Sequence, residues 1–285
     1  MSDSGIALID KPQGFTSHDV VAKLRGILGT RKIGHAGTLD PMATGLLVIG
    51  VGSGTKLMNY LSGSSKSYVA TVRLGQATFT DDAEGEITAV ADQSELRNLT
   101  SELILETISS FQGVQLQKPS KVSAKKIDGK RAYDLARAGE DFELAAVEVE
   151  IRRIESSQPR FGDWIDVDIE VDCSSGTFIR SIARDLGENL GVGGHLTALR
   201  RTKVGNFELA DAQQLENASP MGMVEAARKI LPVVEIDEAE ETELSFGRQI
   251  YRSSDFEHLA AIHGDRLIAI VSGGKTLSPK TVFNG

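Results

Sequence analysis

The residues best suited to chemistry lie between Gly34 and Lys56, in a run of glycines, small polar residues and apolar residues. Asp40 is the one acidic residue of this run, and Pro41 follows it and restricts the backbone. A carboxylate with few polar neighbours in a restricted loop suits catalysis better than a solvated surface position. A lone Asp-Pro pair is more often a simple turn, so at this point both interpretations stay open.

The glycines at 45, 50, 52 and 54 also invite comparison with nucleotide-binding loops. A P-loop requires glycine directly before its lysine, whereas Thr55 precedes Lys56. The dinucleotide fingerprint requires a third glycine where Thr55 stands. Both nucleotide motifs are therefore excluded, and the sequence favours glycines that allow close packing at a strand end.

A metal site is not expected from the sequence. His35 and Asp40 have no third ligand at suitable spacing, and the other histidines are scattered along the chain. The single cysteine, Cys173, excludes a cysteine-rich site and an intrachain disulfide, and it is expected to be a small buried apolar residue. The sequence therefore carries no metal or nucleotide signature.

Two acidic clusters have simple interpretations. Asp81 and Asp82 stand in a polar loop before Gly85, and turn formation is the expected role. Residues 235–243 hold six acids and no base, and this run is expected to be a solvated face.

The distribution of basic residues points another way. The net charge of −9 argues weakly against a polyanionic partner. Residues 118–137, however, contain seven Lys or Arg against two Asp, a local charge of +5. Composition alone leaves an RNA-gripping segment and a merely solvated loop equally open.

The elements that must position these residues follow from hydrophobic periodicity. Ser17 is the expected N-cap of the first helix and Gly29 its stop, while Arg180 and Arg184 share one face of a later helix. The absence of a regular strand–helix alternation argues against a doubly wound fold. Strands are expected at 6–9, 46–51, 68–74, 147–151, 165–171, 267–271 and 281–283, and helices at 17–28, 101–111 and 179–190.

The length of 285 residues fits about two domains. The last ~50 residues form short strand-like pieces, too few to stabilise a core easily by themselves, so they are expected to lean on the main domain. No run reaches the ~18 apolar residues of a membrane span, and the N-terminus has no signal-peptide pattern. A cytoplasmic location follows by elimination.

These residues together resemble the TruB family of bacterial tRNA pseudouridine synthases. The resemblance covers most of the chain, and several long blocks in the same order make it far more specific than a single short motif. The blocks are LIDKPQG at 8–14, GHAGTLDPMATG at 34–45, KSY at 66–68, PS at 119–120, SAKK at 123–126, GKRAY at 129–133, GTFIR at 176–180 and LRR at 199–201.

The resemblance implies an α+β fold. Its core is the pseudouridine synthase fold, a central mixed and mostly antiparallel sheet flanked by helices, followed by a small β-rich PUA-like C-terminal domain. The implied catalytic domain spans residues 1–228 and carries an RNA-gripping thumb insertion at about 117–140, placed there by the resemblance. The PUA-like domain spans residues 229–285.

The resemblance also assigns catalytic roles. Asp40 matches the catalytic carboxylate, and Arg180 matches its basic partner, whose charge would keep the carboxylate ionised. Tyr68 matches the pocket tyrosine that stacks on the uracil and assists proton removal.

Further positions match substrate-binding residues of the family. His35 corresponds to the residue that fills the space left when nucleotides flip out of the T-loop. Phe178 holds a stacking position where the family more often has tyrosine, so the hydroxyl is lost, and Leu199 matches an apolar pocket wall. The lysines expected to grip RNA are Lys125, Lys126 and Lys130.

The implied function is the isomerisation of uridine 55 in the tRNA T-loop to pseudouridine, with the T-arm as partner and no metal or cofactor. The enzyme is expected to act as a monomer without a protein partner. A tRNA-folding chaperone is the second hypothesis, and Asp40→Asn separates the two. Guide-RNA-dependent relatives are disfavoured because the thumb insertion is present.

Overall fold

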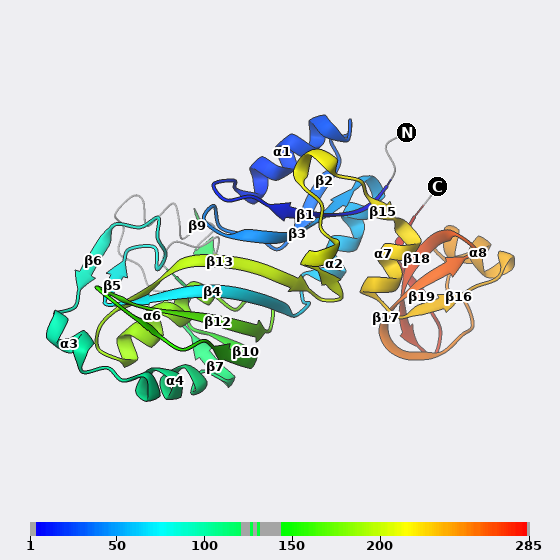
Figure 1. Cartoon of the computed structure of the whole chain (residues 1–285). Helices are drawn as coiled ribbons and strands as arrows, with labels where there is room; N and C mark the ends of the chain where they lie inside the picture. The colour runs from blue at the N-terminus through cyan, green and yellow to red at the C-terminus, as the bar shows by residue number, and fades with distance from the viewer. Residues whose placement is uncertain (1–3, 121–125, 128–129, 132–143, 284–285) are drawn as a thin grey trace. The chain divides into compact units, whose positions relative to one another are not determined.

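The protein is described by a computed structural model that covers residues 4–120, 126–127, 130–131 and 144–283 (Figure 1). The chain forms two compact units. Unit 1 comprises residues 1–40, 45–64 and 204–285, and unit 2 comprises residues 41–44 and 65–203. The domain boundary expected near residue 228 concerns family domains and stays a prediction.

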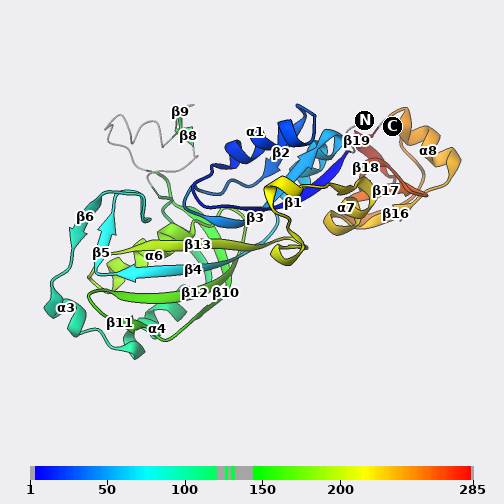
Figure 2. The same cartoon turned by 45° about the horizontal axis from the view of Figure 1, so that its top comes forward.

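Unit 2 is built on an antiparallel sheet in which β13, β4, β12, β10 and β7 follow one another (Figures 1 and 2). The strands are β4 (Lys66–Leu74), β5 (Gln76–Thr78), β6 (Ile87–Val90), β7 (Gly113–Gln117), β8 (Lys126–Ile127), β9 (Lys130–Arg131), β10 (Val147–Ser156), β11 (Arg160–Phe161), β12 (Ile165–Cys173) and β13 (Gly194–Val204). The described helices are α3 (Gln93–Arg97), α4 (Ser101–Ser109) and α6 (Ile179–Asn189).

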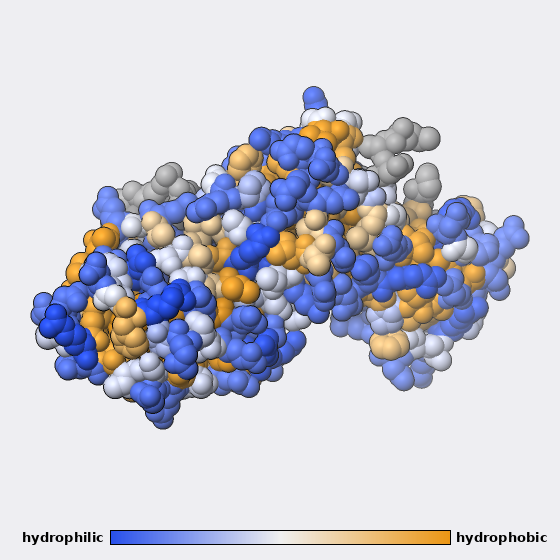
Figure 3. All heavy atoms as spheres, in the orientation of Figure 1, coloured by the Kyte–Doolittle hydropathy of each residue, from blue (hydrophilic) through white to orange (hydrophobic). Residues whose placement is uncertain are grey.

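The two faces of this sheet differ sharply. Strand β12 alternates buried apolar residues with partly exposed acids, and Tyr68 on β4 lies opposite Val171 of β12. Helix α4 contacts β10 and helix α6 contacts β4, so both helices cover the apolar face. Figure 3 shows hydrophilic side chains mixed with hydrophobic patches on the side of unit 2 that this view presents. The predicted one-sided strands are confirmed.

Unit 1 contains a second antiparallel group, in the order β15, β1, β3, β2. Its elements are β1 (Gly5–Lys11), α1 (Ser17–Ile27), β2 (Ile33–Ala36), β3 (Thr44–Val51), η1 (Gly52–Leu57), α2 (Met58–Leu61), β14 (Phe207–Glu208), η2 (Leu209–Asp211), η3 (Leu215–Asn217), β15 (Met221–Gly222) and α7 (Met223–Ile230). Strands and helices together confirm the predicted α+β class.

The N-cap of helix α1 lies one residue earlier than the sequence predicted. Thr16 is the N-cap: its hydroxyl accepts from the Asp19 N–H, and the Asp19 carboxylate accepts from the Thr16 N–H, a reciprocal capping box. The expected N-cap, Ser17, is instead buried inside the first turn. Thr16 and Ser17 are both suitable cap residues, and Asp19 favours Thr16 because it stands three residues after it and completes the capping box.

The glycines near the end of β3 serve close packing, as predicted. A Cβ on Gly54 would stand 2.0 Å from the carbonyl oxygen of Gly5, and one on Gly50 would stand 2.8 Å from the carbonyl oxygen of Gly54. A side chain at Gly54 would push the 3₁₀ turn η1 away from β1, and one at Gly50 would push η1 away from β3. The backbone approach, not a phosphate, accounts for the glycines.

The C-terminal part of unit 1 is a four-stranded sheet with the order β16, β17, β18, β19. Residues from this sheet join a core cluster with Ile6 and Leu8 of β1, so the small sheet leans on its neighbour as expected. Lys56 also donates to the Val282 carbonyl at 2.7 Å. The elements are β16 (Val233–Glu235), α8 (Glu238–Ser245), β17 (Ser254–His263), β18 (Arg266–Gly274) and β19 (Ser278–Val282).

The acidic run that begins this part is not uniformly solvated. The Glu241 side chain is only 15% exposed and pairs with His263 and Arg266 of the β17–β18 hairpin. Glu240 pairs with Arg252 at 2.6 Å. The solvated-face prediction is therefore wrong for these two acids, because α8 lies against basic side chains of the β17–β18 hairpin and of the segment just before it.

None of the helices in the described part of the chain has the length and hydrophobicity of a membrane-spanning segment.

Candidate active site

The loop that carries Asp40 is held from the start of helix α1. The buried hydroxyl of Ser17 donates to the Leu39 carbonyl at 3.1 Å and accepts from the Leu39 N–H at 2.9 Å. Both backbone groups of the residue before Asp40 are thereby satisfied by one side chain. Asp40 itself is partly exposed, directly after buried Leu39. Sequence reasoning missed this role of Ser17, since the contact spans 22 residues.

His35 lies on β2, opposite Ile49 of β3, and is partly exposed. Its ring meets the His18 ring edge to face, with 5.6 Å between the ring centres. His18 belongs to helix α1, so α1 supports both His35 and the Asp40 loop. Within unit 1, the two predicted site residues, His35 and Asp40, therefore lie on one short segment that α1 supports.

The remaining described site residues belong to unit 2. Tyr68 is buried on β4 with 8% of its surface exposed, and Leu199 is buried on β13. Lys66, two residues before Tyr68, is also buried and its ammonium lies 3.3 Å from the Ser175 hydroxyl. Burial lowers the pKa of Lys66, because the charged form loses water.

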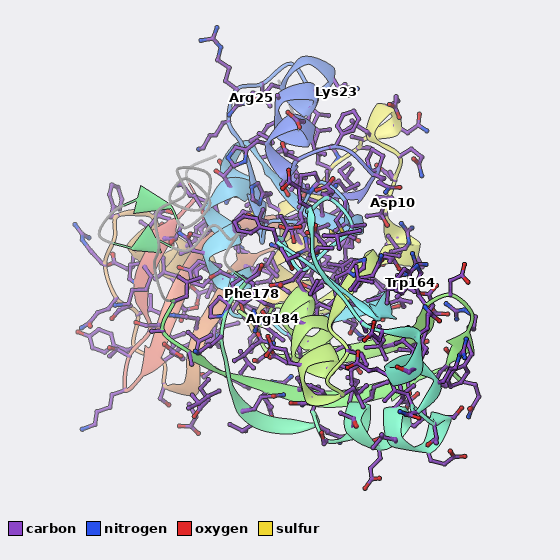
Figure 4. The ribbon with its side chains drawn as sticks, turned by 90° about the vertical axis from the view of Figure 1, so that its left-hand side faces the viewer. Asp10, Lys23, Arg25, Trp164, Phe178 and Arg184 are labelled. Carbon is purple, nitrogen blue, oxygen red and sulfur yellow. The ribbon has the colours of Figure 1, made fainter. Side chains whose placement is uncertain are left out.

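Phe178 is the N-cap residue of helix α6 and is partly exposed. The Gln117 side chain holds its backbone twice: the amide nitrogen donates to the Phe178 carbonyl at 3.0 Å, and the amide oxygen accepts from the Phe178 N–H at 2.8 Å. Figure 4 shows Phe178 beside α6. Gln117 thus orients an aromatic side chain whose sequence neighbours gave no hint of this support.

Arg180 is a buried cation in the first turn of α6, with 6% of its surface exposed. Its Nη1 donates to the Thr80 carbonyl at 2.8 Å and lies 3.4 Å from the Ser120 hydroxyl. The same nitrogen lies 3.4 Å from the Asp82 carboxylate. A buried charge needs such partners to offset its lost hydration.

The interpretation of Asp82 as a turn residue is therefore incomplete. Its carboxylate does accept from the Thr80 hydroxyl at 2.5 Å and from the Glu84 N–H at 3.0 Å, as a turn residue would. The side chain is nevertheless only 3% exposed and pairs with Arg180. The signal available in the sequence was a second acid, Asp81, directly beside Asp82 in the same short turn.

The structure describes the three predicted RNA-gripping lysines only in part. Lys125 lies outside the described residues. For Lys126 and Lys130 the structure describes only the backbone, which forms the short β8–β9 pair. Their contact with RNA stays a prediction.

The described residues offer two chemical resources. One is a loop carboxylate, Asp40, on a backbone fixed by Ser17. The other is a preorganised guanidinium, Arg180, with an aromatic residue two positions before it. A fixed carboxylate can act as nucleophile or proton-transfer group, and a fixed cation can stabilise negative charge. Within the described ranges, no cluster of three or more His, Cys, Asp or Glu is arranged to hold a metal ion.

Comparison with known families matches residues 25–233 of the chain. Residues 25–179 match the family described as TruB family pseudouridylate synthase (N terminal domain). Residues 180–233 match the family described as tRNA pseudouridylate synthase B C-terminal domain. The Asp40 loop, Tyr68 and Phe178 lie within the first match and Arg180 begins the second.

Individual relatives agree with these matches. A protein named tRNA pseudouridine synthase B from Arthrobacter sp. (strain FB24) is 52% identical over 254 residues, covering 87% of this chain and 82% of that protein. The protein of the same name from Corynebacterium diphtheriae is 48% identical over 291 residues, covering 99% of this chain and 96% of that protein.

Solved structures support the fold. A structure titled as an H/ACA RNP bound to a substrate RNA containing 2′-deoxyuridine matches with a TM-score of 0.70 at 22% identity, covering 99% of this chain and 85% of that one. An archaeal box H/ACA sRNP Nop10–Cbf5 complex also gives a TM-score of 0.70, covering 99% and 87%. The sequence matches and this shared fold show that the chain is an isomerase that belongs to the TruB family of pseudouridylate synthases.

Proposed function

We propose that this enzyme converts uridine 55 in the T-loop of tRNA to pseudouridine. The observation that carries the proposal is the 48% identity, along 99% of the chain, to a relative named tRNA pseudouridine synthase B. The reaction breaks the bond between N1 of uracil and C1′ of the ribose, turns the base, and joins C5 to C1′. The proton leaves C5 and N1 gains one, so the change is an isomerisation.

Access to the glycosidic bond requires the uridine to leave the base stack, which costs a few kcal/mol. Stacking on an aromatic side chain recovers ~1–3 kcal/mol per base. We assign the stacking to Tyr68, with Phe178 and Leu199 as apolar contacts. His35 takes the space that the flipped nucleotides leave. Tyr68 and Leu199 are buried and Phe178 is partly exposed, and this burial supports their assignment to an apolar slot for one base.

The chemical step is assigned to Asp40, as nucleophile or as proton-transfer group. Its carboxylate must be ionised, and a guanidinium partner favours the ionised form. We assign that partner to Arg180. The hydrogen bonds from Arg180 to Thr80 and its pairing with Asp82 support the assignment, since a preorganised cation costs no reorganisation during reaction. Tyr68 assists proton removal.

RNA contact is assigned to the basic thumb at about 117–140, with Lys125, Lys126 and Lys130 neutralising phosphates. The C-terminal sheet is assigned as a PUA-like domain in residues 229–285, after a catalytic domain of residues 1–228. The enzyme acts on the T-arm in the cytoplasm as a monomer. Changing the three lysines together to Glu is expected to weaken tRNA binding and flatten its salt dependence.

Release of tritium from C5-labelled uridine in an unmodified tRNA transcript tests the catalytic assignment. Asp40→Asn should abolish release while tRNA binding, measured by filter retention, stays near the wild-type value. Asp163→Asn is the matched control, because Asp163 is an exposed aspartate in a loop of unit 2. Full release by the Asp40→Asn enzyme would remove this residue from the mechanism.

Sequencing of the product distinguishes the finer claim. Pseudouridine should appear at position 55 and at no other uridine of the T-loop. Modification elsewhere would overturn the substrate assignment without touching the family assignment.

A further inference from the structure

Helix α6 carries two arginines one turn apart that meet two consecutive aspartates. Arg180 pairs with Asp82, as described above, and Arg184 pairs with Asp81, with 3.4 Å between Nη1 and Oδ2. Figure 4 shows Arg184 on α6, near Phe178, the N-cap residue of that helix. The catalytic assignments account for the first pair and leave the second without a role.

The second pair is not an ordinary surface ion pair. The side chains of Asp81 and Arg184 are 11% and 20% exposed. Asp81 has a backbone φ of 60°, and among the described residues no other non-glycine residue adopts a positive φ. Aspartate tolerates this conformation better than most residues, yet it still costs free energy and persists where the surroundings dictate it. Burial raises the pKa of the Asp81 carboxyl.

Arg184 joins its own helix to two other segments of unit 2. Its Nη2 donates to the Lys118 carbonyl at 2.9 Å, its Nε donates to Asp185 at 2.8 Å, and its Nη1 faces Asp81. The Asp81 carbonyl in turn accepts from the Leu196 N–H of β13 at 3.0 Å. The pair therefore ties the 80–82 turn to α6, to β13 and to the chain just after β7.

The same turn and the same segment hold Arg180. Thr80, one residue before Asp81, provides the carbonyl that accepts from Arg180, and Ser120, two residues after Lys118, provides a hydroxyl at 3.4 Å. Ser120 also donates to the Thr80 carbonyl at 3.2 Å. Thr80, Asp82 and Ser120, which contact Arg180, each stand within two residues of a group that the Asp81–Arg184 pair holds.

We propose that Asp81 and Arg184 are positioning residues that hold the Thr80, Asp82 and Ser120 partners of Arg180, and so fix its guanidinium for the chemical step. The proposal rests on the proposed function of Arg180. Loss of the Asp81–Arg184 pair would let the turn and the 118–120 segment shift, and a displacement of the order of 1 Å in a catalytic group costs up to about a hundredfold in rate.

The test uses full-length enzyme, unmodified tRNA transcript and single-turnover tritium release. Asp81→Asn and Arg184→Lys are each expected to lower the single-turnover rate about tenfold with little change in tRNA affinity. Arg184→Lys keeps the positive charge but not the fork that bridges Asp81, Lys118 and Asp185. The double variant is expected to be no slower than the slower single variant, because the two residues act as a unit.

Arg73 and Asp166 supply the matched control. They form an arginine–aspartate pair in the same unit, on the open face of the sheet, with 2.8 Å between Nε and Oδ1. Arg73→Lys and Asp166→Asn are expected to leave the single-turnover rate unchanged. A general sensitivity of unit 2 to losing an ion pair would slow these variants as well.

A spectroscopic readout separates this inference from the proposed function. In nitrogen-15 spectra of the enzyme alone, the Arg180 Nε–H signal is expected to be sharp in the wild type and broadened in Asp81→Asn and Arg184→Lys. An unchanged Arg180 signal with an unchanged rate overturns the inference, even where the melting temperature falls. Weakened tRNA binding at an unchanged rate also overturns it. A wild-type enzyme that releases no tritium overturns the proposed function instead, and the Arg180 signal still decides the positioning role.

Discussion

Unit 2 contains arginine–aspartate pairs in two contrasting settings. On the open face of the sheet, Arg73 and Asp166 form two parallel hydrogen bonds of 2.8 Å, with side chains 32% and 26% exposed. In the interior, Arg180 and Asp82 stand 3.4 Å apart but are 6% and 3% exposed. The Arg73–Asp166 pair, which has the shorter contact, is thus the more exposed of the two pairs.

The difference teaches that burial, rather than distance, decides what an ion pair does. An exposed pair gains little because water solvates both charges well when they separate. A buried pair gains little net stability as a unit, but either partner left alone is a charge without hydration. Exposed pairs are therefore replaceable, and buried pairs constrain the structure around them.

The largest effect is expected from removing one buried partner. Asp82→Ala should lower the free energy of unfolding by ~3–5 kcal/mol, because the Arg180 charge stays buried with its carboxylate gone. Urea unfolding measures the change, with Asp166→Ala as the matched variant on the open face. Equal losses in the two variants would contradict the role given to burial.

A double-mutant cycle sharpens the same comparison. Asp82→Asn and Arg180→Gln should show a coupling free energy within ~0.5–3 kcal/mol, because each single change strands the other group. The cycle of Asp166→Asn and Arg73→Gln should give a smaller coupling. Urea unfolding of all six variants supplies both values, and a larger coupling on the open face would reverse the ranking.

The pH dependence of stability should have opposite signs in the two settings. The hydrogen bond from Arg73 lowers the pKa of Asp166, so this carboxylate stabilises the fold above the ordinary value of 3.8 and loses that contribution as pH falls below it. Burial raises the pKa of Asp81 despite the nearby Arg184, Ser120 and Arg180, with Asp185 adding to the rise. Asp81 therefore costs stability progressively as pH rises above 3.8 towards its folded value.

Urea unfolding in steps across pH 3–6 checks these signs. The stability difference between wild type and Asp81→Asn should fall as pH rises through the range just above 3.8. The difference between wild type and Asp166→Asn should rise with pH in the range below 3.8. Slopes of the same sign in both variants would show that the two carboxyls share one environment.

The smallest effect is expected from the open face itself. Arg73→Ala should change the free energy of unfolding by no more than ~1 kcal/mol at low salt, and by less at ~1 M salt, where screening acts within ~3 Å. Thermal unfolding at the two salt concentrations measures the change. If the loss of unfolding free energy in Arg73→Ala persists at high salt, the Arg73–Asp166 pair behaves like a buried pair.

Much of the fold could be predicted from local patterns. The alternation from Tyr68 to Leu74 and from Ile165 to Val171 required one buried face, and β4 and β12 have it. The apolar spacing from Val20 to Leu24 required a helix, and α1 provides it. These predictions succeed because period and burial are linked within one element.

The partners of charged residues could not be predicted in the same way. The two arginines on α6 are visible in the sequence, but Asp81 and Asp82 lie about a hundred residues before them. Glu241 was expected to face water, and a hairpin more than 20 residues away supplies His263 and Arg266 instead. Nothing local distinguishes a solvated acid from a paired one.

The sequence by itself determined the family, because long blocks of residues match it in the same order, and that resemblance implied the α+β class and the candidate residues. Only the tertiary structure decided that Ser17 clamps Leu39, that Gln117 holds Phe178, and that Asp82 meets Arg180. The physical reason is desolvation. A polar group becomes costly, and so must find a partner, only when the folded chain removes it from water.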